Sequence, residues 1–308
     1  MRRPPFGPEI RGRKLANVIG VASGTFGYGS EYEEHIDLSS IGALYTKAVT
    51  LRPRPGNDVP RIIETSAGLL NSIGLANVGM ERFVAEKLPS FAAMPCAVIA
   101  NVAADFPDEY AEVVAHLEEA DREGTLWGYE INLSCPNVKA GGVALGSQPV
   151  AVEETSRKVR DITDRPVIVK LTPNVTDITE IARAAEAGGA DAVSCINTVV
   201  GMAIDTKRKR PVLPAGTGGL SGPAVLPIGV AAVYRVSRAV GIPVIGLGGI
   251  SSGDDAVQYL LAGAEAVQLG TINFVNPHAA EEILAEVERY AAENGLTSIA
   301  EFPALLEP

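Results

Sequence analysis

The most regular feature of this sequence is a series of short apolar runs, each followed by a segment of mostly helical periodicity. Eight runs are rich in β-branched residues with few polar interruptions, which is typical of strands buried on both faces of a parallel sheet. They span residues 17–22, 43–49, 96–101, 128–133, 166–171, 191–196, 243–247 and 265–269. Helical patterns cover residues 107–122, 151–162, 178–187, 225–239, 254–261 and 279–293.

Eight strand-and-helix alternations predict a closed (β/α)8 TIM barrel of the α/β class. An open doubly wound sheet is the alternative, but the glycines of residues 24–29 lack the G-x-G-x-x-G spacing of its dinucleotide-binding turn. Residues 52–86, 138–146 and 199–223 are predicted insertions after strands 2, 4 and 6, and such insertions usually shape the active face. No linker or repeat interrupts the pattern, so residues 1–308 are expected to form a single domain.

Composition and charge narrow the class of protein. The chain is 46% hydrophobic with a net charge of −11, which argues against nucleic acid or an anionic membrane as a general partner. No apolar stretch reaches the ~18 residues of a spanning helix, and no apolar segment follows the basic N-terminus as in a signal peptide. Three cysteines without disulfide spacing suit the reducing cytoplasm, and three histidines without ligand spacing predict no metal site.

A cysteine lies between two asparagines directly after the fourth predicted strand, in Asn132-Leu133-Ser134-Cys135-Pro136-Asn137. Pro136 disfavours helical dihedrals at Cys135, so the thiol is expected on an extended turn. A thiol there can accept a proton or act as a nucleophile, while the amides hold a planar polar ligand against it. Most free cysteines are buried structural residues, but the flanking amides favour a chemical role for Cys135.

Every predicted strand ends in a polar or glycine-containing group, as expected for a barrel whose active site lies at the C-terminal face. The groups are Ser23, Lys47, Asn101, Asn132, Lys170, Asn197 with Thr198, Gly248-Gly249 and Gly270-Thr271. Together with Gly222, the last two pairs predict a phosphate site, because glycine lets backbone N–H groups approach an anion. Taken singly, each is better explained as a turn glycine. Lys47 and Lys170 end apolar strands, where an ammonium needs an anionic partner or a functional use.

Four motifs, in this order along the chain, resemble those of the dihydroorotate dehydrogenases. They are Asn71-Ser72-Ile73-Gly74-Leu75, residues 132–137, Lys170-Leu171-Thr172-Pro173 and Gly219-Leu220-Ser221-Gly222-Pro223. The resemblance implies a (β/α)8 barrel that carries FMN at its C-terminal face and oxidises (S)-dihydroorotate to orotate in de novo pyrimidine (UMP) biosynthesis. With Cys135 and without an N-terminal helical extension, the chain resembles class 1 of this family. The membrane-associated class uses serine as its base.

Within class 1, residues 137–142 and 201–205 resemble class 1B, the catalytic subunit of an NAD-linked enzyme. Such a subunit pairs with one that carries FAD and a [2Fe–2S] cluster, which implies a homodimer core inside a heterotetramer. This chain lacks a cysteine cluster for iron–sulfur, so the cluster would lie on the partner. Ala76 is a departure, because related chains often have glutamine there. The alternatives are a fumarate-dependent class 1A enzyme, a non-redox phosphate-binding barrel with a cysteine nucleophile, and a binding protein without activity.

Carried over residue by residue, the resemblance implies a role for each of these positions. Cys135 would take the C5 proton while hydride passes from C6 to FMN N5, and Lys170 would lie near the N1/O2 edge of the flavin. The implied substrate-binding residues are Lys47, Asn71, Ser72, Ile73, Gly74, Leu75, Asn132, Asn197 and Thr198. The implied cofactor-binding residues are Ser23, Lys47, Ala48, Asn101, Asn132, Lys170, Ile196, Gly222, Gly248, Gly249, Gly270 and Thr271. Residues 138–146 would form a lid over Cys135.

Overall fold

A closed barrel of eight parallel strands forms the centre of the computed structural model, which describes residues 6–32, 36–133 and 145–307. The strands pair side by side in the order β10-β15-β16-β3-β4-β7-β8-β9. They are β3 (Ile19–Val21), β4 (Ala43–Tyr45), β7 (Ala97–Val102), β8 (Gly128–Asn132), β9 (Val167–Leu171), β10 (Ala192–Cys195), β15 (Val244–Leu247) and β16 (Ala266–Leu269). The predicted (β/α)8 barrel is confirmed, and only β7 extends past its predicted run, by one residue.

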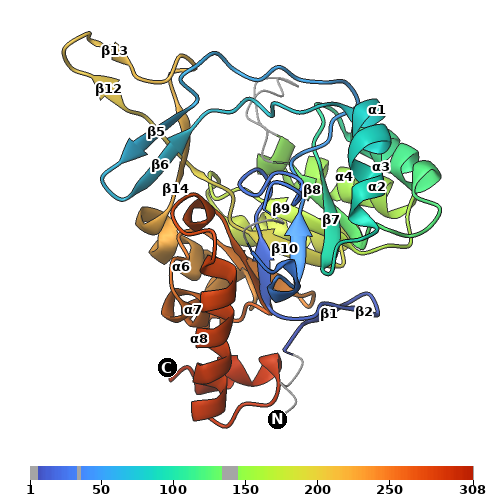
Figure 1. Ribbon diagram of the computed structural model, residues 1–308, viewed down its shortest axis with the longest axis vertical. Coiled ribbons are helices and arrows are strands. Elements are labelled where there is room, and N and C mark those ends of the chain that lie inside the picture. The colour runs from blue at the N-terminus through green and yellow to red at the C-terminus, as the bar shows by residue number, and fades with distance from the viewer. Residues whose placement is uncertain (1–5, 33–35, 134–144, 308) are drawn as a thin grey trace.

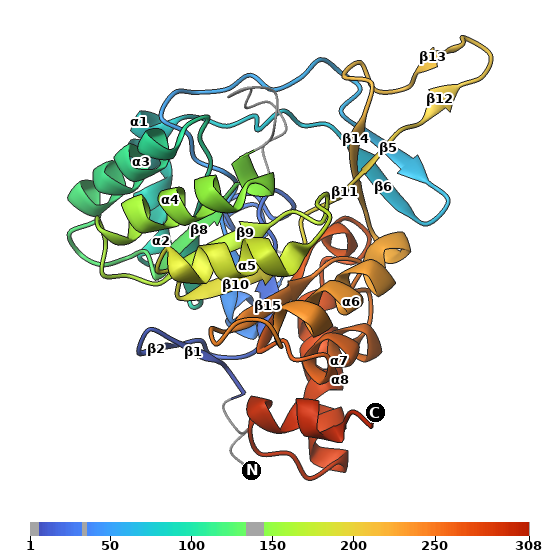
Figure 2. The same cartoon turned by 180° about the vertical axis from the view of Figure 1, so that it is seen from behind.

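Helices surround the barrel (Figures 1 and 2). The long ones are α3 (Pro107–Ala120), α4 (Pro149–Arg160), α5 (Ile178–Ala187), α6 (Leu226–Val236), α7 (Gly253–Leu261) and α8 (Ala279–Glu293). The bounds of α5 and α8 are those predicted from periodicity. At the end of α5, Gly189 takes a φ of +88°, which glycine adopts at little cost. No helix in the described part of the chain has the length and apolar character needed to cross a membrane.

Shorter helical turns connect these elements. They are α1 (Met80–Arg82), the π-helical turn η2 (Phe83–Lys87), α2 (Leu88–Phe91), and the 3-10 turns η1 (Leu38–Ser40), η3 (Leu145–Ser147), η4 (Pro223–Val225), η5 (Thr271–Phe274) and η6 (Ile299–Leu305). Both η4 and η5 lie directly after loops that the sequence predicts to bind phosphate, so their first N–H groups lie at the same end of the barrel as the strand ends.

The two long insertions form strands that pair with each other at one end of the molecule (Figure 1). The insertion after β4 supplies β5 (Ile62–Thr65) and β6 (Gly68–Asn71), and the insertion after β10 supplies β11 (Val199–Gly201) and β14 (Gly218–Ser221). These four strands make an antiparallel sheet in the order β11-β14-β6-β5, which we call the insertion sheet. A hairpin of β12 (Ile204–Asp205) and β13 (Arg210–Pro211) projects farther out (Figure 1). Insertions after strands 2 and 6 are therefore confirmed, whereas residues 138–144 of the third lie outside the described residues.

A short N-terminal hairpin closes the opposite end of the barrel. It consists of β1 (Glu9–Ile10) and β2 (Arg13–Lys14), joined by Arg11 and Gly12 with φ values of 49° and 72°. Two positive φ values are typical of the tight turn that suits the twist of a two-residue hairpin. Apolar side chains of this segment pack onto the lower barrel interior, in a cluster of Ile10, Leu15, Ala43, Tyr45, Ile99, Ile168, Ala192, Ile245 and Ala266.

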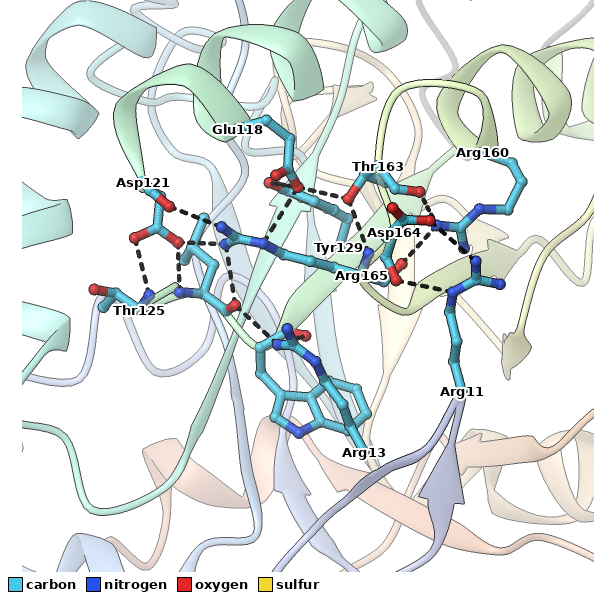
Figure 3. A network of polar contacts seen from close by, with 12 residues as sticks. Arg11, Arg13, Glu118, Asp121, Thr125, Tyr129, Arg160, Thr163, Asp164 and Arg165 are labelled. Carbon is cyan, nitrogen blue, oxygen red and sulfur yellow. Dashed lines mark hydrogen bonds and ion pairs between the residues drawn. The ribbon is translucent and has the colours of Figure 1, made fainter. Parts of the chain in front are cut away.

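A network of charged side chains lies at the same end as the hairpin (Figure 3). Arg165 contacts the Asp121 carboxylate through Nη1, donates Nη2 to the Asp121 carbonyl at 2.8 Å, and lies 3.3 Å from Glu118 Oε1. Arg13 of the hairpin donates to the carbonyl of Trp127 at 3.0 Å. Burial opposes ionisation of Asp121, but backbone donors and the Arg165 guanidinium outweigh it and lower the pKa of that carboxyl. The network therefore joins the hairpin to the loops that precede β8 and β9.

Replacing Arg165 with methionine is expected to lower the free energy of unfolding by about 3 kcal/mol near neutral pH, because Asp121 keeps its charge in a buried place without its partner. Urea unfolding measures the loss. Because the pKa of Asp121 is lowered in the folded state, this stabilisation exists above its ordinary pKa and is lost as pH falls through the folded value. The matched control is Arg157→Met, which removes an exposed ion pair with Glu153 worth under ~1 kcal/mol. Equal losses in the two variants would contradict the prediction.

Candidate functional site

The barrel interior becomes polar toward the C-terminal ends of its strands, around Glu130 on β8. This side chain is fully buried. Its carboxylate accepts hydrogen bonds from Asn101 Nδ2 at 2.6 Å, Ser194 Oγ at 2.8 Å and Gln268 Nε2 at 2.8 Å. Lys170 Nζ lies 3.8 Å from Glu130 Oε2. The donors come from four other strands, so the carboxylate lies where the inward-facing side chains of the barrel meet.

Strand register explains why Lys170 faces this carboxylate. Lys170 on β9 pairs with Asn132 on β8 and with Ser194 on β10, so the three side chains form a row across neighbouring strands. The lysine is only 5% exposed. Burying an ammonium is costly unless an opposite charge compensates, and Glu130 supplies that charge. The sequence requires either an anionic partner or a functional use for Lys170; Glu130 is such a partner, and the functional use that the sequence favours stays a prediction.

Three asparagines at neighbouring strand ends lie in contact above Glu130. Asn132 Nδ2 is 3.5 Å from Asn101 Oδ1, and Asn197 Nδ2 is 3.4 Å from Asn132 Oδ1. Asn197 Oδ1 in turn accepts the backbone N–H of Thr198 at 2.8 Å. The hydroxyl of Tyr110 on α3 donates to the Asn132 carbonyl at 2.9 Å and holds the end of β8 in place. These predicted site residues therefore form one continuous set of amides, which we call the amide chain.

The insertion sheet brings Asn71 to the same region. Asn71 ends β6 and donates Nδ2 to the Gly219 carbonyl on β14 at 3.1 Å. A Cβ on Gly219 would lie 2.0 Å from Thr198 Oγ1, so only glycine lets Thr198 pack against this strand. The sheet therefore joins Asn71 to Thr198, which follows Asn197 of the amide chain.

The loop after Asn71 is braced by two side chains. Asn57 donates Nδ2 to Ser72 Oγ at 2.7 Å, and Asn77 donates Nδ2 to the Leu75 carbonyl at 2.7 Å. Leu75 has a φ of +53°, which is uncommon for a residue with a side chain and is held here by these contacts. The predicted substrate loop Ser72, Ile73, Gly74 and Leu75 is thus a shaped turn beside Asn71.

Backbone N–H groups gather at another part of the strand-end rim. No turn, loop or cap hydrogen bond between described residues uses the N–H of Gly248, Gly249, Gly270 or Thr271 as a donor. Tyr259 Oη donates to the Gly248 carbonyl at 2.7 Å, which fixes the direction of that peptide. The four N–H groups lie after the neighbouring strands β15 and β16, close to the start of η5. Free N–H groups at a helical N-terminus suit an anion such as a phosphate.

Contacts connect this rim to the remaining glycine and to the amide chain. A Cβ on Gly222 would lie 3.5 Å from Thr271 Cγ2, and one on Gly248 would lie 3.6 Å from Ile196 Cγ1. Ile196 directly precedes Asn197. The predicted phosphate loops and the amides therefore lie in one site. We call Gly222, Gly248, Gly249, Gly270 and Thr271 the glycine rim.

Three predicted site residues follow β3 and β4 at the same end. Ser23 lies two residues beyond β3, and Lys47 and Ala48 lie just beyond β4. Lys47 donates its backbone N–H to the Gly27 carbonyl at 2.9 Å, and Ala48 is buried. Their backbone positions match the prediction, while no side-chain contact joins them to the amide chain among the described residues.

The cysteine predicted to be the base, Cys135, lies outside the described residues. The two described cysteines do not resemble a base. Burial raises the pKa of Cys96 to about 11 and also raises the pKa of Cys195, so both remain thiols at neutral pH. Neither of them competes with Cys135 for that role.

Sequence reasoning missed Glu130, Ser194 and Gln268. Each lies inside an apolar run and was taken as part of a buried strand. A signal was present for Glu130, because a charged residue within a strand of a buried sheet needs partners. Glu130 also lies two residues before Asn132, and side chains two apart on a strand point the same way.

Comparisons with known proteins show the family of this chain. The profile of the Dihydroorotate dehydrogenase family matches residues 7–290. Proteins named "Dihydroorotate dehydrogenase B (NAD(+)), catalytic subunit" from Geobacter metallireducens and Geobacter sulfurreducens are each 50% identical over 307 residues, covering 100% of both chains. The protein of that name from Geotalea daltonii is 48% identical over the same length and coverage. The resemblance predicted from the four motifs is confirmed: the chain belongs to the dihydroorotate dehydrogenase family.

Proposed function

We propose that the protein oxidises (S)-dihydroorotate to orotate in de novo pyrimidine biosynthesis, with a flavin as its first electron acceptor. The observation that carries the proposal is the amide chain beside Lys170, next to the glycine rim, in a member of this family. Amide N–H and C=O groups match the donors and acceptors of a dihydropyrimidine ring, and a nearby ammonium suits an anionic reduced cofactor.

The glycine rim fits the phosphate of FMN, because it presents several N–H groups that no turn or cap uses next to a helical N-terminus. When bound, the flavin accepts the hydride that leaves the ring. We assign its binding to Ser23, Lys47, Ala48, Asn101, Asn132, Lys170, Ile196, Gly222, Gly248, Gly249, Gly270 and Thr271. In this assignment Lys170 supplies positive charge to the reduced state while Glu130 holds its side chain in place.

The substrate is held in this proposal by Lys47, Asn71, Ser72, Ile73, Gly74, Leu75, Asn132, Asn197 and Thr198. Asn132 and Asn197 orient the ring through their amides, and the turn after Asn71 covers it from the insertion sheet. Cys135 takes the C5 proton, since it lies three residues after Asn132 in sequence and the described cysteines remain thiols. Residues 138–146 act as the lid.

A partner subunit completes the enzyme. The relatives are named as catalytic subunits of an NAD(+)-type enzyme, which implies such a partner. We infer that the partner carries FAD and a [2Fe–2S] cluster, because three cysteines are too few to hold that cluster on this chain. Residues 1–308 would act as one FMN-binding domain in a homodimer core within a cytoplasmic heterotetramer.

An absorbance spectrum of the purified chain, before and after anaerobic addition of dihydroorotate, tests the proposal. Flavin bands that bleach on addition are the expected result. Bands that persist would contradict the substrate, and a chain that takes up no FMN on reconstitution would favour the non-redox barrel with a cysteine nucleophile. Reoxidation of the bleached protein then separates the acceptors: NAD⁺ with the partner subunit is expected, whereas fumarate acting on the chain alone would indicate class 1A.

A further inference from the structure

We propose that Glu130 is a positioning residue that sets the direction of the amide chain and thereby the pattern of donors that the site offers to the pyrimidine ring. The inference rests on the proposed function, because it concerns the ring that this site binds. The inference goes beyond the proposed function, because it assigns a role to a fully buried residue that lies below the proposed substrate site.

The hydrogen bonds of the amide chain all run one way. The Thr198 N–H donates to Asn197 Oδ1, and Asn197 Nδ2 donates to Asn132 Oδ1. Asn132 Nδ2 then donates to Asn101 Oδ1, and Asn101 Nδ2 donates to Glu130 Oε2. Each side-chain amide donates an N–H on the side that faces Glu130 and accepts a hydrogen bond on the opposite side. The amide chain therefore ends at the Glu130 carboxylate.

The carboxylate imposes that direction from the buried end, and the backbone N–H of Thr198, which only donates, is consistent with it at the other end. The NH₂ and C=O groups of a side-chain amide have nearly the same shape. A row of amides therefore makes equally good hydrogen bonds when every amide is flipped. A carboxylate only accepts. At 2.6 Å from Glu130 Oε2, Asn101 must therefore present Nδ2 to it, which leaves Oδ1 to accept from Asn132. Each later amide follows from the one before it.

Glu130 is itself held so that it cannot turn away. Its second oxygen, Oε1, accepts from Ser194 on β10 and from Gln268 on β16, each at 2.8 Å. Strand β16 lies opposite β8 in the barrel, so Gln268 reaches Glu130 across the interior. Lys170 lies on the Oε2 side at 3.8 Å. The carboxylate thus receives donors from both sides of the barrel, and its position is set by the fold.

The two links between asparagines are the long ones, at 3.5 and 3.4 Å, whereas the bond to Glu130 is short. The amide chain is therefore held firmly by Glu130 at its buried end and by the Thr198 N–H at 2.8 Å at its other end, and it is loosest between the asparagines. A bound ring with its own donors and acceptors tightens these links only if it matches the direction that Glu130 sets. Orotate affinity is therefore the property that is expected to depend on the direction of the hydrogen bonds in the amide chain.

The test is a titration of orotate into the FMN-loaded protein, followed by the flavin spectrum or by calorimetry, with thermal unfolding recorded for each variant. Glu130→Met removes the acceptor at nearly constant length and is expected to weaken orotate binding about tenfold or more. Glu130→Gln can turn its carbonyl toward Asn101 and its NH₂ toward Gln268, whose Oε1 has no hydrogen-bond partner among described residues. This variant is expected to keep orotate affinity within about threefold of the original.

Ser156→Ala is the matched control, because it removes a buried hydroxyl that donates to the Val152 carbonyl within α4 and contacts neither Glu130 nor the amide chain. Its orotate affinity is expected to be unchanged. The inference is overturned if Glu130→Met binds orotate as the original protein does, or if Glu130→Gln loses affinity as far as Glu130→Met. Should Glu130→Met fail to fold, Glu130→Gln still decides, since a loss of about tenfold at an unchanged melting temperature would show that charge matters rather than direction. An original protein that binds no orotate would contradict the proposed function instead.

Discussion

Replacing Cys135 with serine is expected to slow the reduction of bound flavin by dihydroorotate about 10²- to 10⁴-fold at pH 7, the usual contribution of a positioned general base. A free cysteine has a pKa of about 8.5, and its thiolate is the form that accepts a proton. A serine hydroxyl does not ionise in the accessible range. The rate of the original protein should rise with pH through a single ionisation, and that rise should be missing in the variant. Anaerobic stopped-flow measurements between pH 6 and 10 give both results.

The matched control for this variant is Cys96→Ser. Cys96 precedes β7 at the opposite end of the barrel, and its pKa is raised by burial to about 11. Its replacement should leave both the rate and the pH profile unchanged. Flavin content should be the same in all three proteins, because Cys135 is not among the residues assigned to FMN. Near-normal reduction by Cys135→Ser would rule out this residue as the base.

Replacing Gly249 with alanine is expected to weaken FMN binding about 10- to 100-fold, the range for losing one charge-assisted hydrogen bond in a site. Gly249 has a φ of +76°, and a Cβ there would lie 2.6 Å from the backbone nitrogen of Leu226, the first residue of α6. Backbone atoms cannot move aside as a flexible side chain can, so the loop after β15 must shift away from the rim. Fluorescence of free flavin after dilution of the loaded protein measures the loss.

Gly295→Ala is the matched control for Gly249→Ala. It separates the effect of a steric contact at the new Cβ from the effect of a positive φ. Gly295 also has a positive φ, +68°, but a Cβ there would meet nothing within 4 Å. This variant carries only the cost of the left-handed conformation, about 1 kcal/mol of stability, and should bind FMN as the original protein does. If the two variants retain flavin equally well, the glycine rim does not hold the phosphate.

The barrel strands could be predicted because each is buried on both faces and is therefore largely apolar, as in Val244–Leu247. The insertion sheet could not be predicted. Strand β14 contains Gly218 and Gly219, residues with low strand propensity, and it pairs with β6, which lies about 150 positions earlier in the chain. Nothing local in either segment indicates its partner, so the sequence predicts the two insertions but not the strands within them.

The candidate site could likewise be predicted only in part. Amides and glycines at strand ends could be predicted because the barrel places all such ends on one rim, and the resemblance then gave each one a role. The charge of Glu130 within a buried strand is a signal in the sequence, but its partners Ser194 and Gln268 could not be predicted, because they approach it only once the barrel closes. The direction of the amide chain likewise depends on contacts across five strands and has no signature in any single motif.

The pairing of the two insertions also bears on how such a barrel changes its substrate in evolution. Four residues of the glycine rim follow barrel strands β15 and β16, whereas Asn71 and the turn after it adjoin the insertion sheet, whose β6 and β14 come from distant parts of the chain. A recombination event that exchanged one insertion alone would leave its strands without a matching edge. We therefore expect that the share of ring specificity proposed for Asn71 and its turn is inherited through two distant segments that must be exchanged together.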